Sequence, residues 1–127
     1  MTPAVMRVTG LSEREIGYMI RQGHAVVDAP GPGNPRRWSA LAIAQAALYS
    51  MVKDQMEHRV AFAACRALTT LCAPNDITPI VGLWMVADRN GQVTLTRNVP
   101  DHLSETVSVL SLDLVVEKVA LVFAGTT

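Results

Sequence analysis

Two arginines and a tyrosine recur along one face of a short segment near the N-terminus. Arg14, Tyr18 and Arg21 are four and three residues apart, which places them on one side of a helix at about 100° per residue. The apolar residues Ile16 and Met19 fall on the other side. Guanidinium groups suit phosphate and guanine contacts better than mere solubility, for which Lys and Glu would serve. The pattern favours contact with DNA, and the alternative is an ordinary solvated helix face.

A capping box marks the start of this helix. Ser12 is followed three residues later by Glu15, and in such a pair each side chain accepts from the other residue's amide. The helix is therefore predicted to begin at Ser12 or Glu13. Upstream, Thr2 and Pro3 are expected to cap and start a first helix, which Gly10 ends. The segment thus reads as a helix, a glycine-containing turn and a second helix.

The next segment has the features of a hairpin wing. Residues 24–28 form a short apolar run, residues 29–35 are rich in Pro and Gly, and a basic stretch begins at Arg36 and Arg37. These patterns predict a strand, a loop and a basic return strand before a helix capped by Ser39. The two arginines are expected to contact DNA, or alternatively to pair with nearby carboxylates. Trp38 is expected in the core.

The order of these features resembles the winged helix-turn-helix of the MerR-like superfamily over roughly residues 3–55. The resemblance rests on 9–12 (Thr-Gly-Leu-Ser), Arg14, Ile16, Tyr18, Gly23, Gly33 and 36–39 (Arg-Arg-Trp-Ser). It implies that the second helix enters the major groove and that the wing touches the flanking backbone. Gly17 stands where the family usually has an arginine. The candidate DNA-binding residues are Ser12, Glu13, Arg14, Gly17, Tyr18, Arg21, Asn34, Arg36 and Arg37.

After the wing the pattern changes from helical to strand-like. Residues 39–73 contain no Gly or Pro, and the polar residues 53–55 are the expected break between two helices. Runs at 80–87 and 92–97 flank an Asn-Gly pair, which predicts a tight hairpin, and 107–112 is a third strand candidate. We therefore expect an α+β fold with two parts, a winged helix-turn-helix at 1–56 and a small module at 57–127.

Residues 114–124 are predicted to form a final helix, capped by Asp113 and almost entirely apolar. A helix that is apolar nearly all round needs burial on more than one side, and so small a domain is expected to need a partner subunit to cover it. The second part thus reads as a dimerisation module, with a sensor pocket or a protein-partner surface as alternatives. The candidate dimerisation residues are Leu114, Val115, Val119, Val122 and Phe123.

The composition of the chain limits the classes of function that it can have. Residues 1–60 hold seven basic and five acidic residues, net +2, and the remainder four and six, net −2, a modest asymmetry in the direction expected for DNA binding. The histidines are scattered and no Cys or His lies near either cysteine, so no metal or other cofactor is expected. No nucleophile and base set is apparent, so we do not expect an enzyme. Cys65 and Cys72 are expected to be buried free thiols.

The sequence therefore predicts a homodimeric transcriptional regulator, with repression as the simpler mechanism, that binds a palindromic double-stranded DNA site. No apolar run is long enough for a membrane span and no signal-peptide pattern is present, so a cytoplasmic, nucleoid-associated protein is expected. Whether a small-molecule effector exists stays open. The alternatives are an excisionase-like or small-terminase-like DNA-binding protein, and an antitoxin or adaptor that acts through protein contacts.

Overall fold

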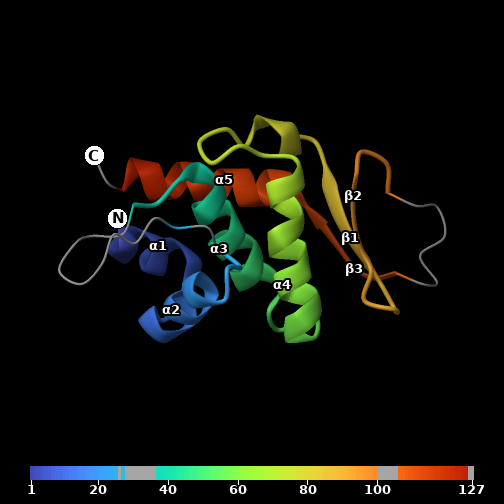
Figure 1. Ribbon diagram of the computed structural model, residues 1–127. Helices are drawn as coiled ribbons and strands as arrows, with labels where there is room; N and C mark the ends of the chain where they lie inside the picture. The colour runs from blue at the N-terminus through green and yellow to red at the C-terminus, as the bar shows by residue number, and fades with distance from the viewer. Residues whose placement is uncertain (26, 28–36, 100–105, 126–127) are drawn as a thin grey trace.

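Five α-helices and a three-stranded antiparallel sheet make up the part of the chain described by the computed structural model, residues 1–25, 27, 37–99 and 106–125 (Figure 1). The expected α+β class is confirmed. Two short 3-10 turns, Leu68–Thr70 and Thr78–Ile80, precede the sheet. The elements are α1 (Thr2–Thr9), α2 (Glu13–Arg21), α3 (Ala40–Val52), α4 (His58–Ala67), β1 (Trp84–Asp88), β2 (Val93–Thr96), β3 (Thr106–Ser111) and α5 (Leu112–Ala124).

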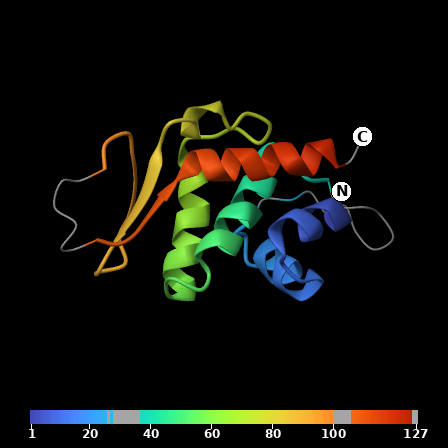
Figure 2. The ribbon, with the colours of Figure 1, turned by 180° about the vertical axis from the view of Figure 1, so that it is seen from behind.

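The central element is α3, which is buried along almost its whole length. Its sequence is apolar on every side, and such a helix is stable only where neighbours surround it. It contacts α1, α4 and α5, and Figures 1 and 2 show it between these helices. Ser39 caps it by accepting from the Ala42 amide at 3.1 Å. The predicted break also holds, because α3 ends at Val52 and α4 begins at His58.

The capping box of α2 is confirmed. The Ser12 hydroxyl accepts from the Glu15 amide at 3.1 Å, and the Glu15 carboxylate accepts from the Ser12 amide at 3.0 Å. Gly10 ends α1 in the left-handed region, which glycine adopts without a steric penalty. Helix α1 starts at Thr2, one residue early, so the Thr2 hydroxyl instead accepts from Trp38 Nε1 at 2.9 Å.

The predicted wing is largely outside the described residues. His24 and Ala25 lie in a bend instead of a strand, because both amides donate to the Met19 carbonyl at 2.8 and 3.3 Å. Residues 26 and 28–36, which include Asn34 and Arg36, are not described. The structure thus contains the two N-terminal helices of the predicted motif, and the winged assignment stays a prediction.

The sheet has the strand order β2-β1-β3, with β1 antiparallel to both neighbours. The Asn-Gly hairpin is confirmed, and Asp88 Oδ1 tightens its turn by accepting from the Asn90 and Gln92 amides, both at 2.9 Å. The first strand begins at Trp84, later than expected, because Pro79 lies in the 3-10 turn Thr78–Ile80. Proline has no amide to donate to a strand neighbour and a fixed φ that suits such a turn.

Helix α5 packs on the helical layer of its own chain (Figure 2). Leu112, Val115, Val119 and Val122 are buried on the side that contacts α1 and α3. The expectation that this inner face needs a partner subunit is therefore wrong, and Val115, Val119 and Val122 are not available to one. Leu114 and Phe123 remain at the surface, with 42% and 38% exposure. Asp113 is not the cap: Ser111 is, and Asp113 accepts from the Gly82 amide at 2.8 Å.

One hydrophobic core runs through both predicted parts, since the same cluster contains Val5, Leu48, Met85 and Val119. Cys65 and Cys72 are free and buried, as predicted. Burial raises the pKa of Cys65 to about 12. Within the described residues, no helix is long and apolar enough to cross a membrane.

Loss of the capping box should destabilise the chain measurably. Ser12→Ala leaves the Glu15 amide without its partner, so we expect the free energy of unfolding to fall by about 1 kcal/mol in urea titrations. Ser50→Ala is the matched control, because Ser50 only donates to the Ala47 carbonyl within α3 and its loss should cost less than about 0.5 kcal/mol. Equal losses in the two variants would contradict this role of Ser12.

Candidate functional site

The outer face of α2 presents the three side chains whose spacing indicates a binding surface. Arg14, Tyr18 and Arg21 are exposed, Tyr18 at 45%, while Ile16 and Met19 are buried on the other side. Within the described part of the chain neither arginine forms an ion pair. Two guanidinium groups therefore stand uncompensated on one side of a short helix, where an anion can reach them.

The remaining predicted site residues fall in three groups. Ser12 and Glu13 are exposed at the start of α2, and Ser12 already uses its hydroxyl and amide in the capping box. Gly17 is buried, so the prediction that it contacts DNA is wrong. Arg37 is exposed, whereas Asn34 and Arg36 lie outside the described residues.

The three α2 side chains border a hollow of about 450 Å³ that sequence reasoning missed. We call it the α2–α4 groove. Arg14, Tyr18 and Arg21 line it together with Glu15, Tyr49, His58 and Phe62. It therefore combines two cationic side chains of α2 with aromatic rings from α3 and α4.

Phe62 is the centre of the rings in and behind this groove. Its ring centroid lies 4.8 Å from Tyr49, 5.7 Å from Tyr18 and 5.9 Å from His58. The His24 ring stacks on Phe62 at 4.0 Å with an interplanar angle of 6°. His24 and His58, scattered in the sequence, thus meet around one phenyl ring. The spacing of His58 and Phe62, four residues apart on one helix, was the available signal.

An ion pair fixes α2 against the end of α3. Lys53 Nζ lies 3.0 Å from Glu15 Oε2. The bond from the Ser12 amide and the Lys53 ammonium hold the pKa of Glu15 below its usual value, against the opposing effect of partial burial. Glu15 therefore stays ionised, but its charge is already matched by Lys53. The net charge contributed at the groove is that of Arg14 and Arg21.

The groove also contains an unused hydrogen-bond donor. Tyr49 is only 5% exposed, yet its hydroxyl makes no hydrogen bond with any residue that the structure describes. Burial is the main cause that raises its pKa, so the hydroxyl keeps its proton. Among the described residues the one buried side-chain N or O atom without a partner is His24 Nδ1, so the Tyr49 hydroxyl itself reaches solvent and is available to a ligand in the groove.

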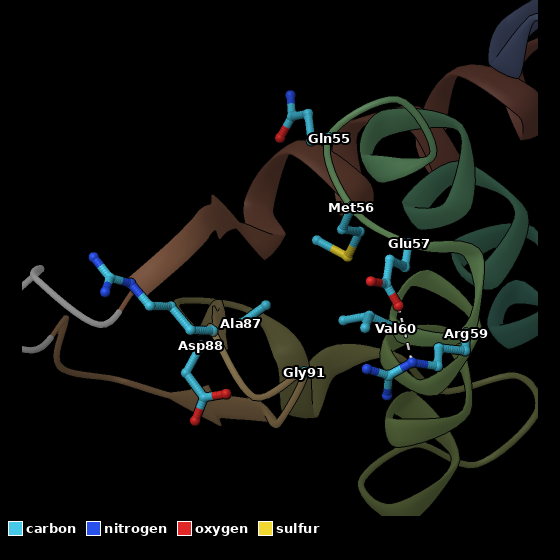
Figure 3. A pocket seen from close by; sticks show the side chains of 9 residues that line it. Gln55, Met56, Glu57, Arg59, Val60, Ala87, Asp88 and Gly91 are labelled. Carbon is cyan, nitrogen blue, oxygen red and sulfur yellow. Dashed lines mark hydrogen bonds and ion pairs between the residues drawn. The ribbon is translucent and has the colours of Figure 1, made fainter.

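A second hollow of about 280 Å³ lies between the start of α4 and the β1–β2 turn (Figure 3). Several of its polar groups are already paired. Arg59 Nε lies 3.0 Å from Glu57 Oε2, Asp88 Oδ1 accepts two turn amides, and Gln55 Oε1 accepts from the Ser108 hydroxyl at 3.3 Å. This hollow offers less to a charged ligand than the α2–α4 groove does.

Comparison with models of known protein families found none that matches the chain, and comparison with curated proteins found no match. Among the residues that the structure describes, no three His, Cys, Asp or Glu side chains are grouped so that they could hold a metal ion. The case for a function therefore rests on α2 and on the groove beside it.

The stacked histidine behind the groove should make stability depend on pH near neutrality. His24 is 8% exposed, and its Nδ1 has no hydrogen-bond partner within the described part of the chain. Burial first, and the positive charge of Arg66 second, lower the pKa of His24. A lowered pKa means that the folded state favours the neutral ring. The neutral ring therefore makes its full contribution to the free energy of unfolding above about pH 6.5. This contribution is lost as the pH falls through 6.5 toward the lower pKa that His24 has in the folded state.

We therefore expect the free energy of unfolding of the wild type to decrease from pH 7 to pH 5 in urea titrations. His24→Phe keeps an aromatic partner for Phe62 and should remove this part of the decrease. Arg66→Gln leaves the His24 ring in place but removes the nearby positive charge. This variant should therefore show a smaller decrease in the free energy of unfolding than the wild type. Glu15 titrates in a more acidic window, so it does not obscure the result. The same pH dependence in wild type and His24→Phe would contradict the assignment.

Proposed function

We propose that this protein binds double-stranded DNA through the outer face of α2 and acts as a homodimeric transcriptional regulator, most simply as a repressor. The observation that carries the proposal is the exposed, uncompensated set of Arg14, Tyr18 and Arg21 on a helix that is held firmly. Such a helix is preorganised, because buried apolar residues, the capping box and the Lys53 ion pair all fix it. Preorganisation lowers the entropic cost of binding.

The width of α2 and the positive electrostatic potential of the site suit a DNA groove. Helix α2 has nine residues, and an α-helix with its side chains is about 10–12 Å wide, close to the width of the major groove. His58 is the first residue of α4 and lines the same groove, so the positive end of that helix dipole adds to the charge of Arg14 and Arg21. In this arrangement Arg14 and Tyr18 contact base edges and Arg21 contacts a phosphate.

A dimer is supported by exposed apolar side chains on α5. Leu114 and Leu121 lie seven residues apart, which puts them on one side of the helix, and Leu121 is 55% exposed. Exposed Val81 is next to Gly82, whose amide donates to Asp113 in the first turn of α5. Leu114 and Leu121 form an outer stripe of α5, distinct from its buried face, and Val81 lies near its first turn. A two-fold dimer through this stripe binds half-sites one or two helical turns apart.

Selection of bound DNA from a random pool, at two salt concentrations, tests DNA binding directly. On the enriched site, Arg14→Ala should cost about 1–3 kcal/mol and relax the preference for one base. Arg21→Ala should weaken all sequences alike and reduce the salt slope by about 0.9 for each phosphate that it no longer neutralises. Arg89→Ala is the control, since Arg89 is exposed in the turn between β1 and β2, and Figure 1 shows the sheet and α2 at opposite ends of the molecule. If folded protein enriches no DNA motif, the proposal is wrong.

Sedimentation equilibrium tests the dimer. Leu121→Glu places a charge in the outer stripe of α5 and should raise the dimer Kd by about 10-fold or more, because a buried unpaired charge is costly. Val99→Glu makes the same chemical change at an exposed apolar position beyond β2 and should leave the Kd unchanged. A wild type that stays monomeric, or a Leu121→Glu variant that dimerises as well as the wild type, would refute the α5 interface.

A further inference from the structure

The α2–α4 groove has the composition of a ligand site as well as that of a DNA-facing surface. A volume of about 450 Å³ lies in the range of small-molecule pockets, about 300–1,000 Å³. Such pockets have apolar and aromatic walls with a few polar groups that fix orientation. Here Tyr18, Phe62 and Tyr49 supply the rings, and Arg14 and Arg21 supply the charge.

The charge and ring geometry select the class of ligand. Arg14 and Arg21 have no carboxylate partner among the described residues, and the one carboxylate of the groove, Glu15, is matched by Lys53. An anion therefore finds two available guanidinium groups, and the unpaired Tyr49 hydroxyl adds a neutral donor. Tyr18 is 45% exposed and His58 is exposed as well, so these two rings of the groove are open to aromatic contact, whereas Phe62 and Tyr49 are buried. A cationic ligand would meet like charge at the same place.

We infer that the α2–α4 groove binds a planar aromatic anion, whose ring packs against Tyr18 and His58 and whose anionic group pairs with the arginines of α2. Binding of this ligand occupies the side chains that the proposed DNA complex needs. The ligand and DNA then exclude each other, so the ligand acts as an effector that releases the operator. This antagonism rests on the proposed function, whereas the ligand site itself does not.

Isothermal titration of the full-length protein with naphthalene-2-carboxylate tests the site. Naphthalene-2-carboxamide is the matched probe, with the same ring and shape but no charge. We expect the carboxylate to bind at concentrations up to about 1 mM and the amide to bind about 10-fold more weakly or worse, because charge-assisted hydrogen bonds to arginine are lost. The double variant Arg14→Gln/Arg21→Gln should bind both probes equally weakly.

Two further variants serve as a control and as a test of a single hydroxyl group. Arg89→Gln changes the same type of residue in the exposed β1–β2 turn and should bind as the wild type does. Tyr49→Phe keeps the ring and removes only the hydroxyl, so it should fold and should weaken carboxylate binding several-fold. Equal affinity for carboxylate and amide, or no effect of the double arginine variant, would overturn the site.

Competition on the selected DNA separates this inference from the proposed function. Release of DNA by the carboxylate and not by the amide supports both the ligand site and the proposed function. If the protein binds DNA but not the carboxylate, the groove is not a ligand site and the proposed function stands. If it binds the carboxylate through the arginines but enriches no DNA, the ligand site stands, while the proposed function and the antagonism fall.

Discussion

The burial of α3 is the constraint on which the rest of the structure depends. Five of its thirteen residues are alanines, and short side chains let the flanking helices approach closely. Gln45 is fully buried, and it fixes the register of α3 against α4 through a reciprocal pair. Its side-chain amide donates to the Cys65 carbonyl at 3.1 Å, and the Cys65 thiol donates to the Gln45 carbonyl at 3.3 Å. A shift between the two helices would break both bonds inside the core.

This register also builds the site. Tyr49 lies one turn after Gln45, and Phe62 lies three residues before Cys65, so the same pairing brings their rings together at 4.8 Å. The ion pair from Lys53, just beyond α3, then positions α2 over those rings. Core packing and the groove are therefore parts of one arrangement. A change deep in the α3–α4 contact should reach the arginines of α2 without touching them.

Local signals predicted much of the fold, and long-range contacts account for what they missed. The Ser12 capping box, the Ser39 cap and the Asn-Gly turn are complete within a few residues, so the sequence shows them directly. By contrast, Asp113 has the chemistry of a cap, but the nearby Gly82 amide, 31 residues away in the chain, takes its carboxylate. The cover of α5 by α1 and the meeting of His24 with His58 likewise depend on tertiary packing. The arginine face of α2 was predictable, and the aromatic half of the groove was not.

The bond between Trp38 and Thr2 has a consequence for how this chain can change over time. Together with the two amides that donate to the Met19 carbonyl, it ties down both flanks of residues 26–37. The entropy of closing a loop grows only with the logarithm of its length, at about 0.6 kcal/mol per doubling. Insertions or deletions in this segment should therefore cost the core little. Homologous chains are free to vary the length and charge of this segment, while the helices that hold its two ends keep their sequence.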